Sequence, residues 1–185
     1  DDQKQHLELC RDIAQKFNND FGKENFFKVP EPLIQKNFSR IMSLKDGLRK
    51  MSKSEPSDLS RINLTDEKDQ ILNKIKKAKT DAMPMPVSID DLEKRPEAKN
   101  LMGIYSSLSD TSLEKNIDNF SGKNFSEFKD NLSQLLVDKL EPISVEIKKL
   151  LSEKNYLNQI LLDGNEKANK IASKKVNEIH NIMGF

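Results

Sequence analysis

Apolar side chains recur at spacings of three and four residues through most of the chain, and this periodicity constrains the fold more than any other feature. Because one helical turn takes 3.6 residues, such spacing places these side chains on one face of a helix. The pattern is carried by residues 71–78, 98–108, 113–140 and 143–151. We therefore expect a mainly α chain.

Two further helices are predicted near the ends of the chain. The first is indicated by apolar residues within 7–21 and stops at Gly22, and the last begins after Gly164. Cys10 lies on the apolar face of the first helix, where an inert core residue is expected. Pro142 is expected to kink or divide the long apolar run in which it stands.

One short segment has the character of a strand. Residues 41–44 are apolar and precede Asp46-Gly47, a typical turn dipeptide. The polar segment 45–61 has no period and is predicted to be a long loop, which in a compact domain is usually functional or disordered. Residues 81–96 contain three prolines and are predicted to be a linker.

Composition excludes several classes of function. With 31 Lys+Arg against 30 Asp+Glu, the net charge of +1 argues against coating nucleic acid by bulk electrostatics, so such contact needs a local patch. One cysteine and two histidines exclude a disulfide framework and a multi-cysteine metal site, and we expect no metal site built by the chain. The sequence contains no run of 18 apolar residues, so we expect no membrane span within it.

The segment Lys50-Met51-Ser52-Lys53-Ser54 carries the chemistry. Ammonium and hydroxyl groups both bind phosphate oxygens, and a loop can close when its substrate arrives. In nucleotidyl transfer the leaving pyrophosphate gains negative charge, which nearby cations stabilise. Loops rich in Lys and Ser are also common as solvated linkers. A candidate strand before this segment and a helix after it favour the phosphate site.

Two other groups of residues have both a structural and a functional interpretation. His6 suits acid–base chemistry, although a histidine in a first helical turn is more often structural. A basic cluster at the end of the helix at 71–78 suits the negative end of the helix dipole, and it could equally contact a nucleic-acid backbone. This cluster consists of Lys74, Lys76, Lys77 and Lys79.

The segment 50–54 reads KMSKS, the second ATP motif of class I aminoacyl-tRNA synthetases, and its surroundings resemble bacterial-type tryptophanyl-tRNA synthetases. The resemblance is specific and covers nearly the whole chain. Its other segments are residues 2–9, 41–44, 60–66, 74–81, 100–106 and 166–169.

The resemblance implies a role for each motif position. Lys50, Ser52, Lys53 and Ser54 would bind the ATP phosphates, with Lys50 and Lys53 as the catalytic cations. The remaining implied ATP contacts are Ile41 and Met51 at the adenosine and Asp1 and Asp2 near the ribose, while Gln3 would face tryptophan. The family usually has Gly-Glu-Asp-Gln at this point, so Asp1 is a mild departure.

The resemblance also implies a domain organisation. Residues 1–62 would be the second half of a Rossmann-type α/β catalytic domain, with the KMSKS loop at 45–58. Residues 63–162 would form an all-α domain that binds the tRNA anticodon. Residues 163–185 would form a C-terminal helix that packs back on the catalytic domain.

The implied activity is ATP-dependent activation of L-tryptophan to tryptophanyl-adenylate, followed by transfer to tRNA(Trp). ATP would enter with Mg²⁺, and the whole enzyme would be a cytoplasmic homodimer, with an organelle left open. The first ATP motif of the family is missing from the 185 residues, so we expect a truncated chain that is inactive alone. The alternative is a non-catalytic RNA-binding or interaction module derived from a synthetase.

Overall fold

The computed structural model describes residues 4–34 and 40–185. Its backbone separates into two compact units. The central unit is continuous, Lys36–Lys149, whereas the terminal unit combines Asp1–Gln35 with Leu150–Phe185. The central unit therefore contains the whole KMSKS segment, and the terminal unit contains both ends of the chain.

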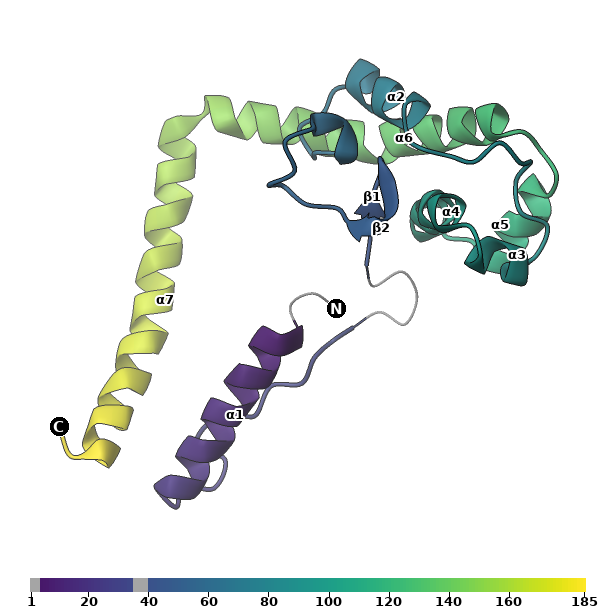
Figure 1. Cartoon of the computed structure of the whole chain (residues 1–185). Coiled ribbons are helices and arrows are strands. Elements are labelled where there is room, and N and C mark those ends of the chain that lie inside the picture. Colours follow the sequence, from purple (N-terminus) through teal and green to yellow (C-terminus); the bar gives the residue numbers. More distant parts are fainter. Residues whose placement is uncertain (1–3, 35–39) are drawn as a thin grey trace. The chain divides into compact units, whose positions relative to one another are not determined.

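The central unit is a small antiparallel hairpin surrounded by helices (Figure 1), which confirms the mainly α prediction. Strand β1 (Met42–Ser43) pairs with β2 (Asp46–Lys50). The helical elements that follow are a 3₁₀ helix η1 (Asp58–Ser60), α2 (Lys68–Lys76), α3 (Ile89–Glu93), α4 (Pro96–Ser109), α5 (Leu113–Phe120) and α6 (Phe125–Ser152).

The core of the central unit lies between α2, α4, α5 and α6. Ile71 and Ile75 of α2 are fully buried, as the helical spacing predicts. Tyr105, Phe120 and Phe128 join α4, α5 and α6 through an aromatic cluster, with ring centroids 4.9 Å apart for Phe120 and Phe128. The three helices are thus fixed by apolar contacts at predictable positions.

The strand prediction at 41–44 was wrong in its boundaries. The turn lies at 44–45 and not at 46–47, and residues 46–50 form β2 inside the segment predicted to be a loop. In β2 only Gly47 is buried, and the three residues after it are exposed. An exposed edge strand of this kind carries no apolar alternation, so its sequence resembles a loop.

Gly47 places the hairpin directly against the start of α4. A Cβ atom built on this glycine would lie 2.6 Å from the Pro96 carbonyl carbon and 2.6 Å from the Glu97 nitrogen. Both obstructing atoms belong to the backbone, so they cannot rotate away. The hairpin therefore approaches α4 more closely than any residue with a side chain allows.

Two other boundaries differ from the predictions, and one prediction is narrowed to a single outcome. The linker predicted at 81–96 contains α3, whose first turn is capped because the Asp91 amide donates to the Ser88 hydroxyl at 3.2 Å. Of the two outcomes predicted for Pro142, a kink or a division of the run, division does not occur, because α6 continues to Ser152. Helix α7 (Lys154–Met183) begins well before Gly164, because one internal glycine costs only about 1 kcal/mol.

The terminal unit contains α1 (Lys4–Asp20) and α7. Four phenylalanines of α1 and the segment after it form an aromatic cluster: Phe17, Phe21, Phe26 and Phe27. The Lys175 ammonium of α7 lies 3.7 Å from the centroid of the Phe26 ring and donates to the Phe26 carbonyl at 3.3 Å. This cation–π contact joins α7 to the aromatic cluster.

Two side-chain environments in the terminal unit differ from expectation. Cys10 is exposed, so its prediction as a core residue was wrong. Helix α7 has no buried residue, although its apolar stripe follows helical spacing.

The predicted domain boundary at residue 163 lies inside this helix. Among the described residues, no helix combines the length and apolar character that crossing a membrane requires.

A bidentate ion pair holds the segment between α2 and α4. The Arg95 Nε and Nη2 atoms lie 2.8 and 2.7 Å from the two carboxylate oxygens of Asp81. Arg95 is buried, and its hydrogen bond is the main reason that the pKa of Asp81 lies below its ordinary value. The pair fixes the proline-rich segment to the start of α4.

Replacing Gly47 by alanine should destabilise the chain by about 1–3 kcal/mol, because the new methyl group overlaps the α4 backbone. Urea unfolding followed by circular dichroism measures this loss. The control is Gly164→Ala, the same change in open space within α7, which should raise stability by about 0.5–1 kcal/mol. Equal stability of Gly47→Ala and the original chain would contradict the close approach.

Replacing Asp81 by asparagine should cost about 2 kcal/mol of stability at pH 7, because Arg95 loses its bidentate carboxylate partner and keeps the longer contact with Asp91 at 3.6 Å. The folded pKa of Asp81 lies below the ordinary value of 3.8. This stabilisation is therefore complete above pH 3.8 and is lost as the pH falls through the folded pKa.

Unfolding of both chains between pH 7 and pH 3 measures the difference, which should shrink on acidification. Glu93→Gln is a suitable control, because it breaks the exposed Lys99–Glu93 pair and should change little at any pH. A difference between Asp81→Asn and the original chain that stayed constant with pH would rule out this charge effect.

Candidate functional site

The hairpin presents the KMSKS segment at its open end. Lys50 is the last residue of β2, and the Met51 amide donates to the Ile41 carbonyl at 3.1 Å, which extends the pairing by one bond. The structure thus brings together Ile41 and Met51, two of the sequence-predicted adenosine contacts. Both are partly exposed.

Residues 51–54, here called the motif loop, turn back on themselves. The hydroxyl oxygens of Ser52 and Ser54 are 2.8 Å apart, and the Ser54 amide donates to the Ser52 hydroxyl at 3.3 Å. Lys53 lies between them and is exposed, as is Lys50 at the base of the loop. Two hydroxyls and neighbouring cations open to solvent can bind an anionic oxygen-rich group such as a phosphate.

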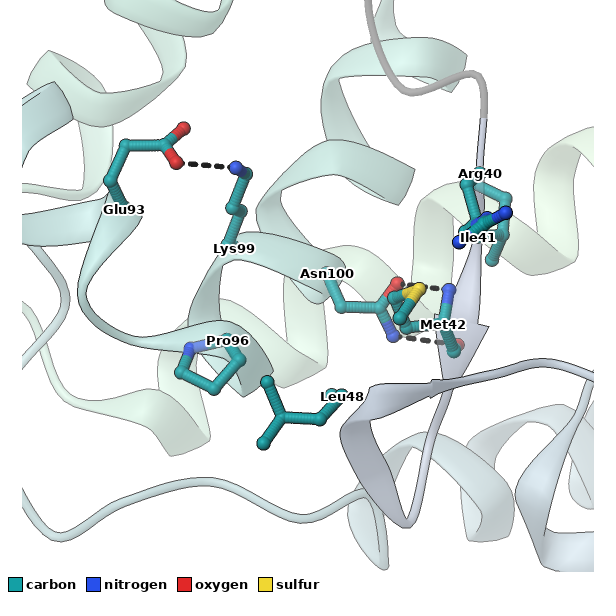
Figure 2. Close-up of a pocket in the computed structure, with 9 residues that line it drawn as sticks. Arg40, Ile41, Met42, Leu48, Glu93, Pro96, Lys99 and Asn100 are labelled. Atoms are coloured by element: carbon teal, nitrogen blue, oxygen red, sulfur yellow. Dashed lines mark hydrogen bonds and ion pairs between the residues drawn. The ribbon is translucent and has the colours of Figure 1, made fainter. Parts of the chain in front are cut away.

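Asn100 anchors the hairpin to α4 and was not recognised from the sequence. Its side-chain oxygen accepts from the Met42 amide at 2.9 Å, and its side-chain nitrogen donates to the Met42 carbonyl at 2.8 Å (Figure 2). The amide side chain thereby pairs with β1 as a neighbouring strand would. The helical spacing gave no signal for it, because Asn100 lies on the opposite side of the predicted helix at 98–108 from its apolar face.

A cavity of about 320 Å³ lies between the hairpin and the start of α4 (Figure 2). Its walls include Ile41, Met42 and Leu48 of the hairpin segment and Pro96 of α4. Lys99 also lines it and forms an ion pair with Glu93. The cavity adjoins Ile41 and therefore belongs to the same hairpin that presents the motif loop.

Lys74 differs sharply from the other lysines of the predicted basic cluster. It is buried, and its ammonium lies 2.7 Å from Asp58 and 2.6 Å from Asp66. The hydrogen bond from Lys74 is the main reason that the pKa of Asp58 is lowered. The ammonium of Lys74 is thus enclosed by carboxylates and does not face solvent.

The other three lysines of the cluster, Lys76, Lys77 and Lys79, are exposed. Lys79 lies 2.8 Å from Glu97, and this hydrogen bond raises the pKa of Lys79. In the described part of the chain, Lys76 and Lys77 form no ion pair. Their ammonium groups are available for a polyanion.

Three sequence-predicted site residues, Asp1, Asp2 and Gln3, lie outside the described residues. His6 is exposed in the first turn of α1. Within residues 4–34 and 40–185, no group of three or more His, Cys, Asp or Glu side chains is placed to hold a metal ion.

The family model for class I tRNA synthetases of the W and Y type matches residues 1–141. That match covers most of the chain and includes the hairpin, the motif loop and the helices packed against them. The chain therefore belongs to the class I tRNA synthetases of this type.

The individual relatives that match the chain are tryptophan–tRNA ligases. The chain is 53% identical over 185 residues to the tryptophan–tRNA ligase of Rickettsia felis, and all of it aligns with 55% of that protein. It is 48% identical to the tryptophan–tRNA ligase of Agrobacterium fabrum, covering 57% of it. The chain thus spans little more than half the length of these curated relatives.

Solved structures agree with the sequence comparisons. Tryptophanyl-tRNA synthetase from Mycoplasma pneumoniae matches the whole chain with a TM-score of 0.82 and 27% identity, over 54% of its own length. The enzyme from Campylobacter jejuni, solved with ADP and tryptophan, matches with a TM-score of 0.67 and 27% identity, over 55% of its length. The predicted resemblance to this family is confirmed.

Proposed function

We propose that this chain is the C-terminal portion of a tryptophan–tRNA ligase. The whole enzyme uses ATP to activate L-tryptophan as tryptophanyl-adenylate, with release of pyrophosphate. It then transfers tryptophan to tRNA(Trp). The observation that carries the proposal is the motif loop itself. It presents the exposed Lys53 between Ser52 and Ser54 in the sequence, with the two hydroxyls 2.8 Å apart, in a chain 53% identical to a tryptophan–tRNA ligase.

The proposed chemistry is a displacement at the α-phosphorus of ATP. A tryptophan carboxylate oxygen forms the new bond, the bond to the bridging oxygen of the β-phosphate breaks, and pyrophosphate leaves with the electron pair. Lys50 and Lys53 stabilise the charge that develops on this leaving group, and Ser52 and Ser54 donate to its oxygens. ATP binds as its Mg²⁺ complex, and Ile41 and Met51 contact the adenosine.

The remaining parts of this proposal rest on the resemblance. Asp1 and Asp2 lie beside the ribose, and Gln3 faces tryptophan. Residues 1–62 form the second half of the catalytic domain, and residues 63–162 form the helical domain that binds the tRNA anticodon. Residues 163–185 pack on the catalytic domain. The whole enzyme is a homodimer in the cytoplasm.

Lys76, Lys77 and Lys79 are proposed to contact the tRNA backbone. Their exposure at the end of α2 supports this role, and Lys79 would exchange its contact with Glu97 for a phosphate. We leave Lys74 out of this surface, because its ammonium is buried between two carboxylates.

A chimera tests the proposed activity. The segment of the Rickettsia felis ligase that precedes its matching region would be fused ahead of Asp1. This chimera should catalyse tryptophan-dependent exchange of pyrophosphate into ATP, whereas the 185-residue chain alone should not. Lys53→Ala in the chimera should lower kcat of exchange by about 100-fold or more and leave tryptophan binding nearly unchanged, because the cation acts in the transition state.

The control is Lys115→Ala, which removes an exposed cation of α5 far along the chain from the motif loop. A folded chimera without exchange activity, beside an active Rickettsia felis parent, would contradict the proposal. Binding of tRNA by such an inactive chimera would favour the alternative, a non-catalytic RNA-binding module.

Replacing Lys76 and Lys77 together by alanine should raise the KM for tRNA(Trp) several-fold and leave exchange activity unchanged. Each lost phosphate contact should also reduce the dependence of log affinity on log salt by about one unit. The charge-matched control is Lys68→Ala with Lys115→Ala, two exposed lysines elsewhere in the central unit. An equal rise in KM for both double variants would show that only net charge matters.

A further inference from the structure

We propose that Arg61 is the positioning residue of the motif loop, because its guanidinium holds the backbone where the chain leaves the loop. The inference rests on the proposed function, since it assigns how Lys53 is kept in place to act. Arg61 lies outside the KMSKS segment, and in this proposal it does not contact the nucleotide.

The contact that matters joins Arg61 to the residue directly after the loop. The Arg61 Nη1 atom donates to the Glu55 carbonyl at 2.9 Å. Glu55 follows Ser54, so this bond fixes the direction of the chain as it leaves the motif loop. At the other end, the bond between the Met51 amide and the Ile41 carbonyl fixes the entry. Only Ser52, Lys53 and Ser54 lie between these two anchors.

The guanidinium of Arg61 is itself held at its other two nitrogens. Its Nη2 atom lies 3.1 Å from the Asp58 carboxylate, and its Nε atom donates to the Asn63 side-chain oxygen at 3.2 Å. The side chain is only 19% exposed. Because all three nitrogens have partners, the guanidinium has one orientation and the Glu55 carbonyl has a fixed donor.

An ion-pair network that includes the buried Lys74 supports Arg61. The second oxygen of Asp58 binds the Lys74 ammonium of α2, which also binds Asp66. The Asn63 side-chain nitrogen donates to both carboxylates, at 3.0 Å to Asp58 and 3.1 Å to Asp66. With two cations and two anions, the network has no net charge, so burial of Lys74 leaves no uncompensated ion.

The position of this network explains how it serves catalysis. It connects α2, which belongs to the packed core, with a single backbone carbonyl at the exit of an otherwise exposed loop. A short loop fixed at both ends loses less conformational entropy when it closes on a phosphate. A displacement of a catalytic group by about 1 Å can cost a factor of about 100 in rate.

Arg49 provides a matched comparison, because it also contacts Glu55. Its guanidinium lies 3.5 Å from the Glu55 carboxylate, and its side chain is 69% exposed. An exposed pair at this distance contributes little. The two arginines therefore carry the same charge beside Glu55, but Arg61 is much less exposed and is the one that bonds to the Glu55 backbone.

The test uses the chimera and compares Arg61→Gln with Arg49→Gln. Arg61→Gln should lower kcat of pyrophosphate exchange by about 10- to 100-fold per active site, counted from the adenylate burst, with an unchanged KM for tryptophan. Arg49→Gln should change kcat less than twofold. Arg61→Lys keeps the charge but cannot serve all three acceptors, so it should recover only part of the loss.

A double-mutant cycle with Lys53→Ala separates positioning from stability. If Arg61 acts through Lys53, Arg61→Gln should cost much less in the Lys53→Ala background than in the original chimera. Equal factors in both backgrounds would overturn the inference. Failure of both Arg61 variants to reach the native circular dichroism spectrum would also overturn it, because Arg61 would then serve stability alone.

Amide hydrogen exchange of the 185-residue chain tests the same contact without any activity. Arg61→Gln should speed exchange at residues 52–55, and Arg49→Gln should not. Unchanged exchange in Arg61→Gln would count against the inference. A chimera without exchange activity, combined with faster amide exchange in Arg61→Gln, would contradict the proposed ligase function and leave the role of Arg61 in holding the loop supported.

Discussion

The Lys74 ammonium is buried in the last turn of α2, and the arrangement of the motif segment depends on how its charge is compensated. A buried cation is tolerated only with carboxylates in good geometry, and removing one partner costs about 3–5 kcal/mol. Asp58 and Asp66 supply these partners at 2.7 and 2.6 Å. The chain that follows the motif loop must therefore return to α2, which limits where the loop itself can lie.

Helical spacing in the sequence predicted most of the core, because burial on one face of a helix leaves a direct trace in the pattern. Ile71, Phe128 and Leu132 are fully buried at positions that this spacing selected. Contacts made by backbone atoms leave no such trace. Strand β2 was interpreted as a loop for this reason, since its placement depends on Gly47 against the α4 backbone and not on apolar side chains.

The motif itself was readable because its chemistry resides in five consecutive residues, whereas its supports are scattered along the chain. Asn100 pairs with β1 from a helix more than fifty residues away, at 2.9 Å from the Met42 amide. Lys74 resembles its exposed neighbours in the sequence and differs only in its burial. Its spacing, three residues after Ile71 and four before Ala78, places Lys74 on the buried face of α2, but its carboxylate partners come from a different segment and left no signal.

The contact at Gly47 has a consequence for how this surface can vary. Since the α4 backbone at Gly47 and the Asn100 side chain locate the hairpin, the exposed side chains of Leu48 and Arg49 contribute little to its position. Their identity can change without moving the strand, so the electrostatic potential beside the neighbouring cations is adjustable independently of the scaffold. Evolution or design can therefore adjust the local field through substitutions at these two positions while the hairpin keeps its place against α4.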